Sequence, residues 1–170
     1  MKIIKIIGLL IVFCSSLNAQ KLITKEGRID IIATDHAPHT LEEKQGTYFN
    51  APSGGPLVQH SLVAAMEFVR RGEMSMEKLV EKMCHNPAVL FQIDSRGYVR
   101  EGYHADLVIV DPDQPWKVDR SNILYKCGWS PFEGQEFSSN VTHTIVSGHL
   151  AYVNGKIDES KNGERILFNR

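Results

Sequence analysis

The chain has 170 residues, of which 42% are hydrophobic, and its 19 basic and 20 acidic side chains leave a net charge of -1. Because the charges are so nearly balanced, the chain provides no basic surface for nucleic acid, and we expect no nucleic-acid partner. Composition and length are those of a globular chain that can bury one hydrophobic core.

The first 19 residues have the pattern of a secretory signal peptide. Lysines precede an apolar run over residues 6–13, and Ala19 supplies a small residue at the expected cleavage point. The run is too short to span a bilayer, and Cys14 lacks the preceding small residues of a lipoprotein signal. We expect cleavage after Ala19 and a periplasmic or secreted protein, with an uncleaved interfacial anchor as the alternative.

Two cysteines follow this leader, Cys84 and Cys127. They lie far apart and match no metal-binding spacing, which favours buried free thiols. A single disulfide is the alternative if the protein is exported.

The most informative stretch is IDIIATDHAPH at residues 29–39, where an apolar run ends at polar residues. Residues 29–34 predict a strand buried on both faces, as in a parallel sheet. Asp35, His36 and His39 follow its C-terminal end, where ligands bind in α/β folds. A carboxylate and two imidazoles there suit proton transfer or metal binding. The alternative is a polar loop whose Asp35 and His36 bond local backbone groups.

Turn-forming residues continue to position 56 and include Ser53, Gly54 and Gly55. Adjacent glycines allow positive φ or close approach of backbone N–H groups to a bound carboxylate. A flexible loop tip is the alternative.

Helices and then strands are predicted beyond this loop. Apolar residues from position 58 predict an amphipathic helix of about four turns that ends near Gly72. A second helix should begin with Ser75 as N-cap and stop before Pro87. We expect His60 and His85 on a helix surface or at a helix end, without a cofactor role.

Short antiparallel strands are predicted in the last part of the chain. They cover residues 98–99, 107–110, 141–146 and 150–153. An aromatic loop over residues 122–137 lies between them and is expected to be structural.

Several of these motifs resemble the dihydroorotases, zinc enzymes of the amidohydrolase superfamily. TDHAPHT at residues 34–40, with the APSGGP loop at 51–56, is similar to the last barrel strand and following loop of that family, and DHAPH is specific to it. HNPA at 85–88 resembles its Asn-Pro-Ala step, and residues 97–111 resemble a signature shared by many amidohydrolases. The resemblance runs from about residue 29 to the C-terminus.

The resemblance implies an α/β fold: the C-terminal portion of a TIM-type (β/α)8 barrel, with its last strand and helices over residues 29–90. Part of an accessory β-sandwich would follow over 91–170. The implied reaction is reversible hydrolysis of the cyclic amide of dihydroorotate to N-carbamoyl-aspartate, in pyrimidine biosynthesis. Asp35 would be the catalytic proton carrier and lie within the metal site. His39 would bond the substrate carboxylate, and Ser53 and Gly54 would contact substrate through the backbone.

The chain also departs from the family, whose zinc is bound mainly by a His-x-His pair and two later histidines. None of the seven histidines here forms such a pair. Zinc is the implied cofactor, yet we expect neither zinc binding nor turnover from this chain alone. A second chain supplying the rest of the barrel, or self-association through open strand edges, is expected. The alternatives are a non-catalytic amidohydrolase remnant or binding module, and a cytoplasmic location that suits pyrimidine synthesis.

Overall fold

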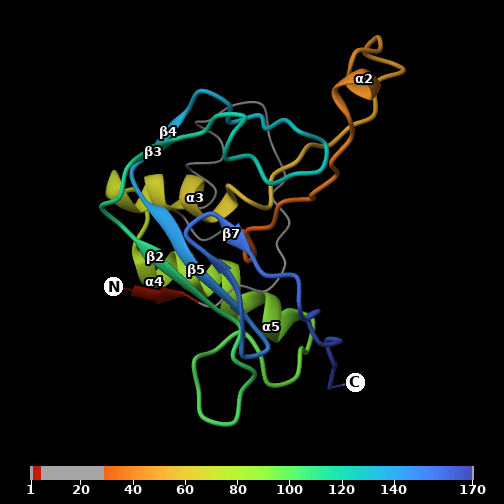
Figure 1. Cartoon of the computed structure of the whole chain (residues 1–170). Helices are drawn as coiled ribbons and strands as arrows, with labels where there is room; N and C mark the ends of the chain where they lie inside the picture. The colour runs from red at the N-terminus through yellow and green to blue at the C-terminus, as the bar shows by residue number, and fades with distance from the viewer. Residues whose placement is uncertain (1, 5–28, 170) are drawn as a thin grey trace.

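The computed structural model describes residues 2–4 and 29–169. Helical elements cover the first half of this range: α2 (Leu41–Lys44), α3 (Ser61–Arg70), α4 (Met76–Val80), the π-helical turn η1 (Glu81–His85) and α5 (Asn86–Leu90). The strands are β1 (Lys2–Ile4), β2 (Leu107–Asp111), β3 (Trp116–Lys117), β4 (Glu136–Phe137), β5 (Asn140–Val146), β6 (His149–Val153) and β7 (Lys156–Ile157). Helices α4 and α5 lie along one side of the sheet, whereas α2 projects from the body on a loop (Figure 1).

The main sheet has the order β1-β2-β5-β6-β7, and its neighbouring strands are antiparallel. Its three longer strands confirm the strands predicted at 107–110, 141–146 and 150–153. Val108 and Val110 of β2 are buried toward the helices, while all seven residues of β5 are half-buried. A separate pair, β3 and β4, brings Trp116 opposite Phe137.

The helices and the sheet share one hydrophobic core. Its members come from α3, α4, η1 and β2 and comprise Leu62, Ala65, Met66, Leu79, Met83, Cys84, Val108 and Val110. Each buried Val, Leu or Met side chain among them contributes about 1.5–3 kcal/mol relative to exposure. Helix α3 starts later than expected and ends at Arg70, and Gly72 follows with a φ of 68°. The Ser75 side chain caps α4 by accepting from Lys78 N–H, as predicted.

The prediction that the second helix stops before Pro87 is wrong. The chain continues through η1 into α5, and Asn86 N–H donates to Glu81 C=O, five residues back. Pro87 lies in the first turn of α5, a position at which its fixed φ suits the helix. The wider π turn therefore lets the helix pass the proline.

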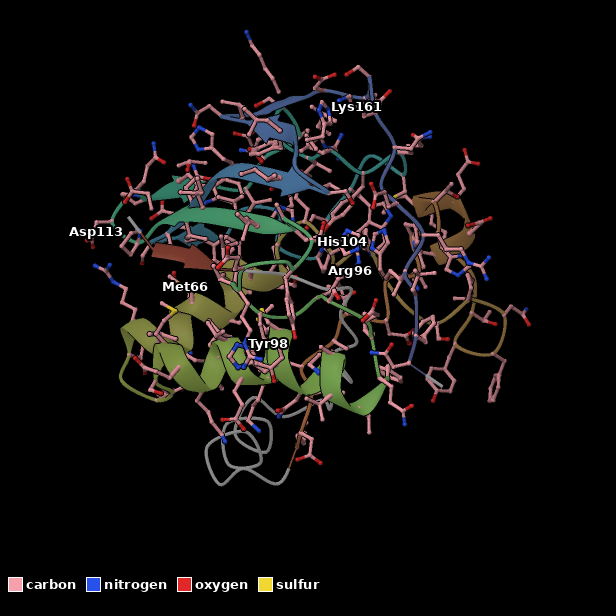
Figure 2. The ribbon with its side chains drawn as sticks, turned by 90° about the horizontal axis from the view of Figure 1, so that it is seen from below. Met66, Arg96, Tyr98, His104, Asp113 and Lys161 are labelled. Carbon is pink, nitrogen blue, oxygen red and sulfur yellow. The ribbon has the colours of Figure 1, made fainter. Side chains whose placement is uncertain are left out.

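The strand predicted at residues 98–99 is also absent, and these described residues form an irregular loop. The Tyr98 ring stacks on the His85 ring with centroids 4.3 Å apart, so its preferred contact is the helix (Figure 2). Val99 is 66% exposed and has no strand partner. His85, the last residue of η1, therefore lies within a continuous helical stretch and is half-buried, with its face covered by an aromatic ring.

A buried ion pair closes this irregular loop. The Arg96 guanidinium bonds the Asp106 carboxylate, which also accepts from Ser147 N–H at 2.7 Å. Both charged side chains are buried. Asp106, part of the motif at residues 97–111, thus joins the loop to the β5–β6 turn.

The expected leader is described only at Lys2–Ile4, where β1 pairs with β2. Residues 5–19, with the expected cleavage point, lie outside the described residues. Within the described range, no helix is long and apolar enough to cross a membrane. Cys84 and Cys127 are both free; Cys84 is buried, as predicted, whereas Cys127 is only half-buried.

Candidate functional site

The segment before the site is extended but does not form the predicted strand. Described residues 29–40 contain only isolated bridges, at Ala33 and His36. Ile32 N–H donates to Lys82 C=O at 3.1 Å, so the backbone partner is a helical turn. A parallel strand needs a flanking strand to bond its N–H and C=O groups, and none of the described strands lies there. Ala33 and Thr34 are nevertheless buried.

Asp35 turns the chain out of this segment into solvent. Its φ of 43° is in the left-handed region, which aspartate tolerates better than most residues. The side chain is exposed, and no described residue bonds its carboxylate. The alternative that Asp35 satisfies a local backbone group therefore finds no support in the described contacts.

His36 behaves differently from Asp35. Its Nδ1 accepts from Leu57 N–H at 3.1 Å, and its ring lies 5.4 Å from the ring of Tyr125. This histidine binds a backbone group, as the alternative interpretation proposed for it. Its role is to tie the two loops of the site together.

The loop after Asp35 and the Ser53–Gly55 loop lie side by side. His36 and Gly55 form a parallel bridge, and Ala37 N–H donates to Gly55 C=O at 3.1 Å. Gly54 has a φ of 85°, and a Cβ there would lie 2.5 Å from Ala37 Cβ. Only glycine fits this contact, because real Cβ atoms do not approach so closely. The close approach predicted for this glycine is thus made to the neighbouring loop.

His39 stands at the start of α2, where a capping box orders the backbone. Thr40 Oγ1 accepts from Glu43 N–H, and the Glu43 carboxylate accepts from Thr40 N–H at 2.9 Å. His39 Nδ1 lies 3.2 Å from the same carboxylate. The Thr40 N–H and then the His39 ring lower the pKa of Glu43. The Nε2 atom of His39 has no partner in the described structure and remains open to a ligand.

The loop that follows α2 is closed at its neck and exposed at its tip. Lys44 Nζ donates to Pro52 C=O, which joins the two sides of the neck. Tyr48 and Phe49 at the tip are each 92% exposed, and their rings pack edge to face with centroids 5.4 Å apart. The neck therefore belongs to the site, whereas the tip reaches away from it (Figure 1).

Trp129 is a site residue that sequence reasoning missed. Its Nε1 donates to His39 C=O at 2.8 Å, and its ring would contact a Cβ at Gly55 at 3.8 Å. The aromatic loop was expected to be structural. The contact made by Trp129 is structural, but it holds a loop of the candidate site in place. No local sequence signal could have paired residues so far apart in the chain.

His60 lies at a helix end, one of the two positions expected for it, but its side chain is buried in the core. It immediately precedes α3, and its fully buried ring is enclosed by Trp116, Tyr125, Phe132 and Phe137. Ser130 Oγ lies 3.1 Å from its Nδ1. Burial lowers the pKa of His60 to about 4, so the ring is neutral at pH 7.

These residues do not fit a zinc ion by themselves. A catalytic zinc takes about three protein ligands in fixed geometry. The structure, over the residues it describes, contains no group of three His, Cys, Asp or Glu that could hold a metal. Nδ1 of His36 already accepts from Leu57 N–H, and the groups of the site that remain, the Asp35 carboxylate and Nε2 of His39, are fewer than three ligands.

Comparison with known proteins places this site in a family context. A model described as "Amidohydrolase family" matches residues 15–151. The chain is 42% identical over 109 residues to a dihydroorotase of Halobacterium salinarum, covering 64% of this chain and 26% of that protein. It is 39% identical over 129 residues to a dihydroorotase of Clostridium acetobutylicum, covering 75% and 30%. The chain thus spans about a third or less of these relatives.

Solved structures show the same fold. An L-hydantoinase (dihydropyrimidinase) from Arthrobacter aurescens aligns with a TM-score of 0.73 and 32% identity, covering 81% of this chain and 32% of that one. A D-hydantoinase aligns with a TM-score of 0.75 at 19% identity, covering 82% and 32%. The predicted fold class, an α/β portion of a TIM-type amidohydrolase, is confirmed. Sequence, fold and family model agree, and the chain belongs to the amidohydrolase family.

Proposed function

We propose that this chain carries part of the active site of a dihydroorotase, which hydrolyses the cyclic amide of dihydroorotate to N-carbamoyl-aspartate in pyrimidine biosynthesis. The observation that carries the proposal is the junction of two loops, with the exposed Asp35 and the half-buried His39 on one and Ser53 and Gly54 on the other. Relatives named dihydroorotase at 39–42% identity support it.

Asp35 is proposed as the proton carrier. When a cyclic amide opens, the attacking water must lose a proton and the departing ring nitrogen must gain one. An exposed carboxylate without a protein partner can accept the proton from the water and pass it to the nitrogen. The C–N bond breaks as the new C–O bond forms, so Asp35 ends the cycle ionised, as it began.

His39, Ser53 and Gly54 are proposed to bind the substrate carboxylate. The backbone N–H groups of Ser53 and Gly54 donate to no described residue. An open imidazole nitrogen on one loop and two free N–H groups on the neighbouring loop would together make a suitable site for an anion. This site would select dihydroorotate over dihydrouracil, which has the same ring without the carboxylate.

Zinc dependence is part of the proposal by family resemblance, with Asp35 as one ligand. The described residues do not supply enough ligands to hold the ion by themselves. The remaining ligands would therefore come from elsewhere, for example from a second chain. Pyrimidine synthesis favours the cytoplasm, while cleavage of the predicted leader would place the protein in the periplasm or outside the cell.

Ligand binding tests the carboxylate site without requiring turnover. The ¹⁵N-labelled chain is titrated with carbamoyl-aspartate and, as control, with carbamoyl-β-alanine, which lacks the second carboxylate. We expect shifts of the Ser53 and Gly54 amide signals with the first ligand only. The shifts should disappear in His39→Ala and persist in His149→Ala, a control on β6. An unchanged spectrum, or equal response to both ligands, would refute this assignment.

A further inference from the structure

The segment that leads into Asp35 is held at three points by one helical region. Lys82 Nζ donates to Ile29 C=O. Ile32 N–H donates to Lys82 C=O at 3.1 Å. Asn86 Nδ2 donates to Asp30 C=O at 2.7 Å. These bonds supply, from η1 and the start of α5, the backbone contacts that a neighbouring strand would otherwise make.

The π turn explains why the Lys82 carbonyl is available. In an α-helix it would accept from Asn86 N–H, but that group donates to Glu81 C=O. In a continued π-helix the donor would be residue 87, which is a proline without an N–H. The Lys82 carbonyl is therefore left without a donor from its own helix, and Ile32 N–H bonds it instead.

The Lys82 side chain is also unusual. It is 1% exposed, and no described carboxylate forms an ion pair with it. Burial, followed by the charge of Lys78, lowers the pKa of its ammonium group. Burying an ammonium group is costly unless it is well bonded, and its partner here is the Ile29 carbonyl. A lysine that served only to keep the protein surface soluble would not be buried. The burial of the Lys82 ammonium group is explained if its role is to fix the backbone at residue 29.

We propose that Lys82 and Asn86 are positioning residues, which hold the backbone before Asp35 and so fix where Asp35 stands beside the junction of the two loops. The proposal rests on the proposed function, since it concerns the placement of the proton carrier. The position of this backbone can be measured without measuring activity or ligand binding. The positioning acts through the backbone, because neither side chain bonds Asp35.

The two tryptophans provide a reporter and an internal control. Trp129 Nε1 donates to His39 C=O at 2.8 Å, within the loop that follows Asp35. Trp116 Nε1 donates to Ser139 C=O at 2.9 Å, away from it. A displaced loop should move the Trp129 indole N–H signal and leave that of Trp116 in place. Trp116→Phe assigns the two signals.

The test compares Lys82→Met, which keeps the aliphatic stem, with Lys78→Met, which removes an ammonium that bonds Glu81. In Lys82→Met we expect a moved Trp129 signal and amide exchange at residues 32–37 that is about tenfold faster, with β5 unchanged. Lys78→Met should change neither. If Lys82→Met only lowers the urea midpoint, leaving the Trp129 signal and residues 32–37 as they were, Lys82 is merely structural and the proposal fails.

Asn86→Ala is the second variant, in case Lys82→Met does not fold. It removes the bond to Asp30 C=O and should accelerate exchange at residues 32–37 in the same way. Unchanged exchange there overturns the proposal. These measurements use no ligand, so their failure is distinct from a failure of Ser53 and Gly54 to respond to carbamoyl-aspartate, which would overturn the proposed function.

Discussion

Replacing Gly54 by alanine should separate the two loops of the candidate site. Two costs arise at this position. The φ of 85° carries about 1–2 kcal/mol of left-handed strain for a residue with a Cβ. In addition, the new Cβ would lie 2.5 Å from Ala37 Cβ, and overpacking of this kind costs about 1–3 kcal/mol. We therefore expect Gly54→Ala to lower the free energy of unfolding by about 2–5 kcal/mol.

Gly155→Ala is the matched control. Gly155 has a φ of 89°, but no atom lies within 4 Å of a Cβ built there. It should therefore show the strain of about 1–2 kcal/mol alone. Urea unfolding followed by circular dichroism gives both free energies. Amide exchange should also show lost protection at Ala37 N–H, which donates to Gly55 C=O, only in Gly54→Ala. Equal losses of stability in the two variants, with Ala37 still protected, would refute the close-approach argument.

Three further predictions concern charge. Burial sets the folded-state pKa of His60 at about 4, below the value of 6.5 in the unfolded chain. As the pH falls, the unfolded chain therefore binds the proton first. The free energy of unfolding should fall by about 3 kcal/mol as the pH drops from 6.5 to 4. Urea unfolding should show a shallower fall over that pH range in His60→Leu. Asp106→Ala leaves Arg96 buried without its partner and should cost about 3–5 kcal/mol in urea unfolding, more than Arg96→Met. Asp35→Asn should bind carbamoyl-aspartate at least as tightly by calorimetry, because an anion is removed near an anionic ligand; weaker binding would contradict its role as proton carrier.

Local patterns predicted the three longer strands of the main sheet. Val108 and Val110 face the core from β2, as their spacing requires. The strand predicted at residues 98–99 failed because a ring stack with His85 outweighs β propensity there. The helix end predicted at Pro87 failed because a π turn absorbs the proline, which no single-residue propensity foresees.

The candidate site could be predicted only in part. The motif at residues 34–40 drew attention to Asp35 and His39, and the paired glycines to the second loop. The contacts of His39 with Trp129 and of His36 with Tyr125 each span more than half of the chain's length in sequence. They depend on tertiary packing, which periodicity and spacing do not encode. For the same reason the burial of His60 among aromatic side chains could not be foreseen.

The closed neck between Lys44 and Pro52 makes the loop beyond it a place where new sequence can be accepted. Its tip residues Tyr48 and Phe49 support no core, so replacing or lengthening the tip should leave the fold intact. Doubling the length of such a loop costs only about 0.6 kcal/mol in closure entropy. The same fold could thus acquire a different molecular surface at the end of this loop through changes at the tip alone, and a grafted peptide there would be displayed away from a preserved site.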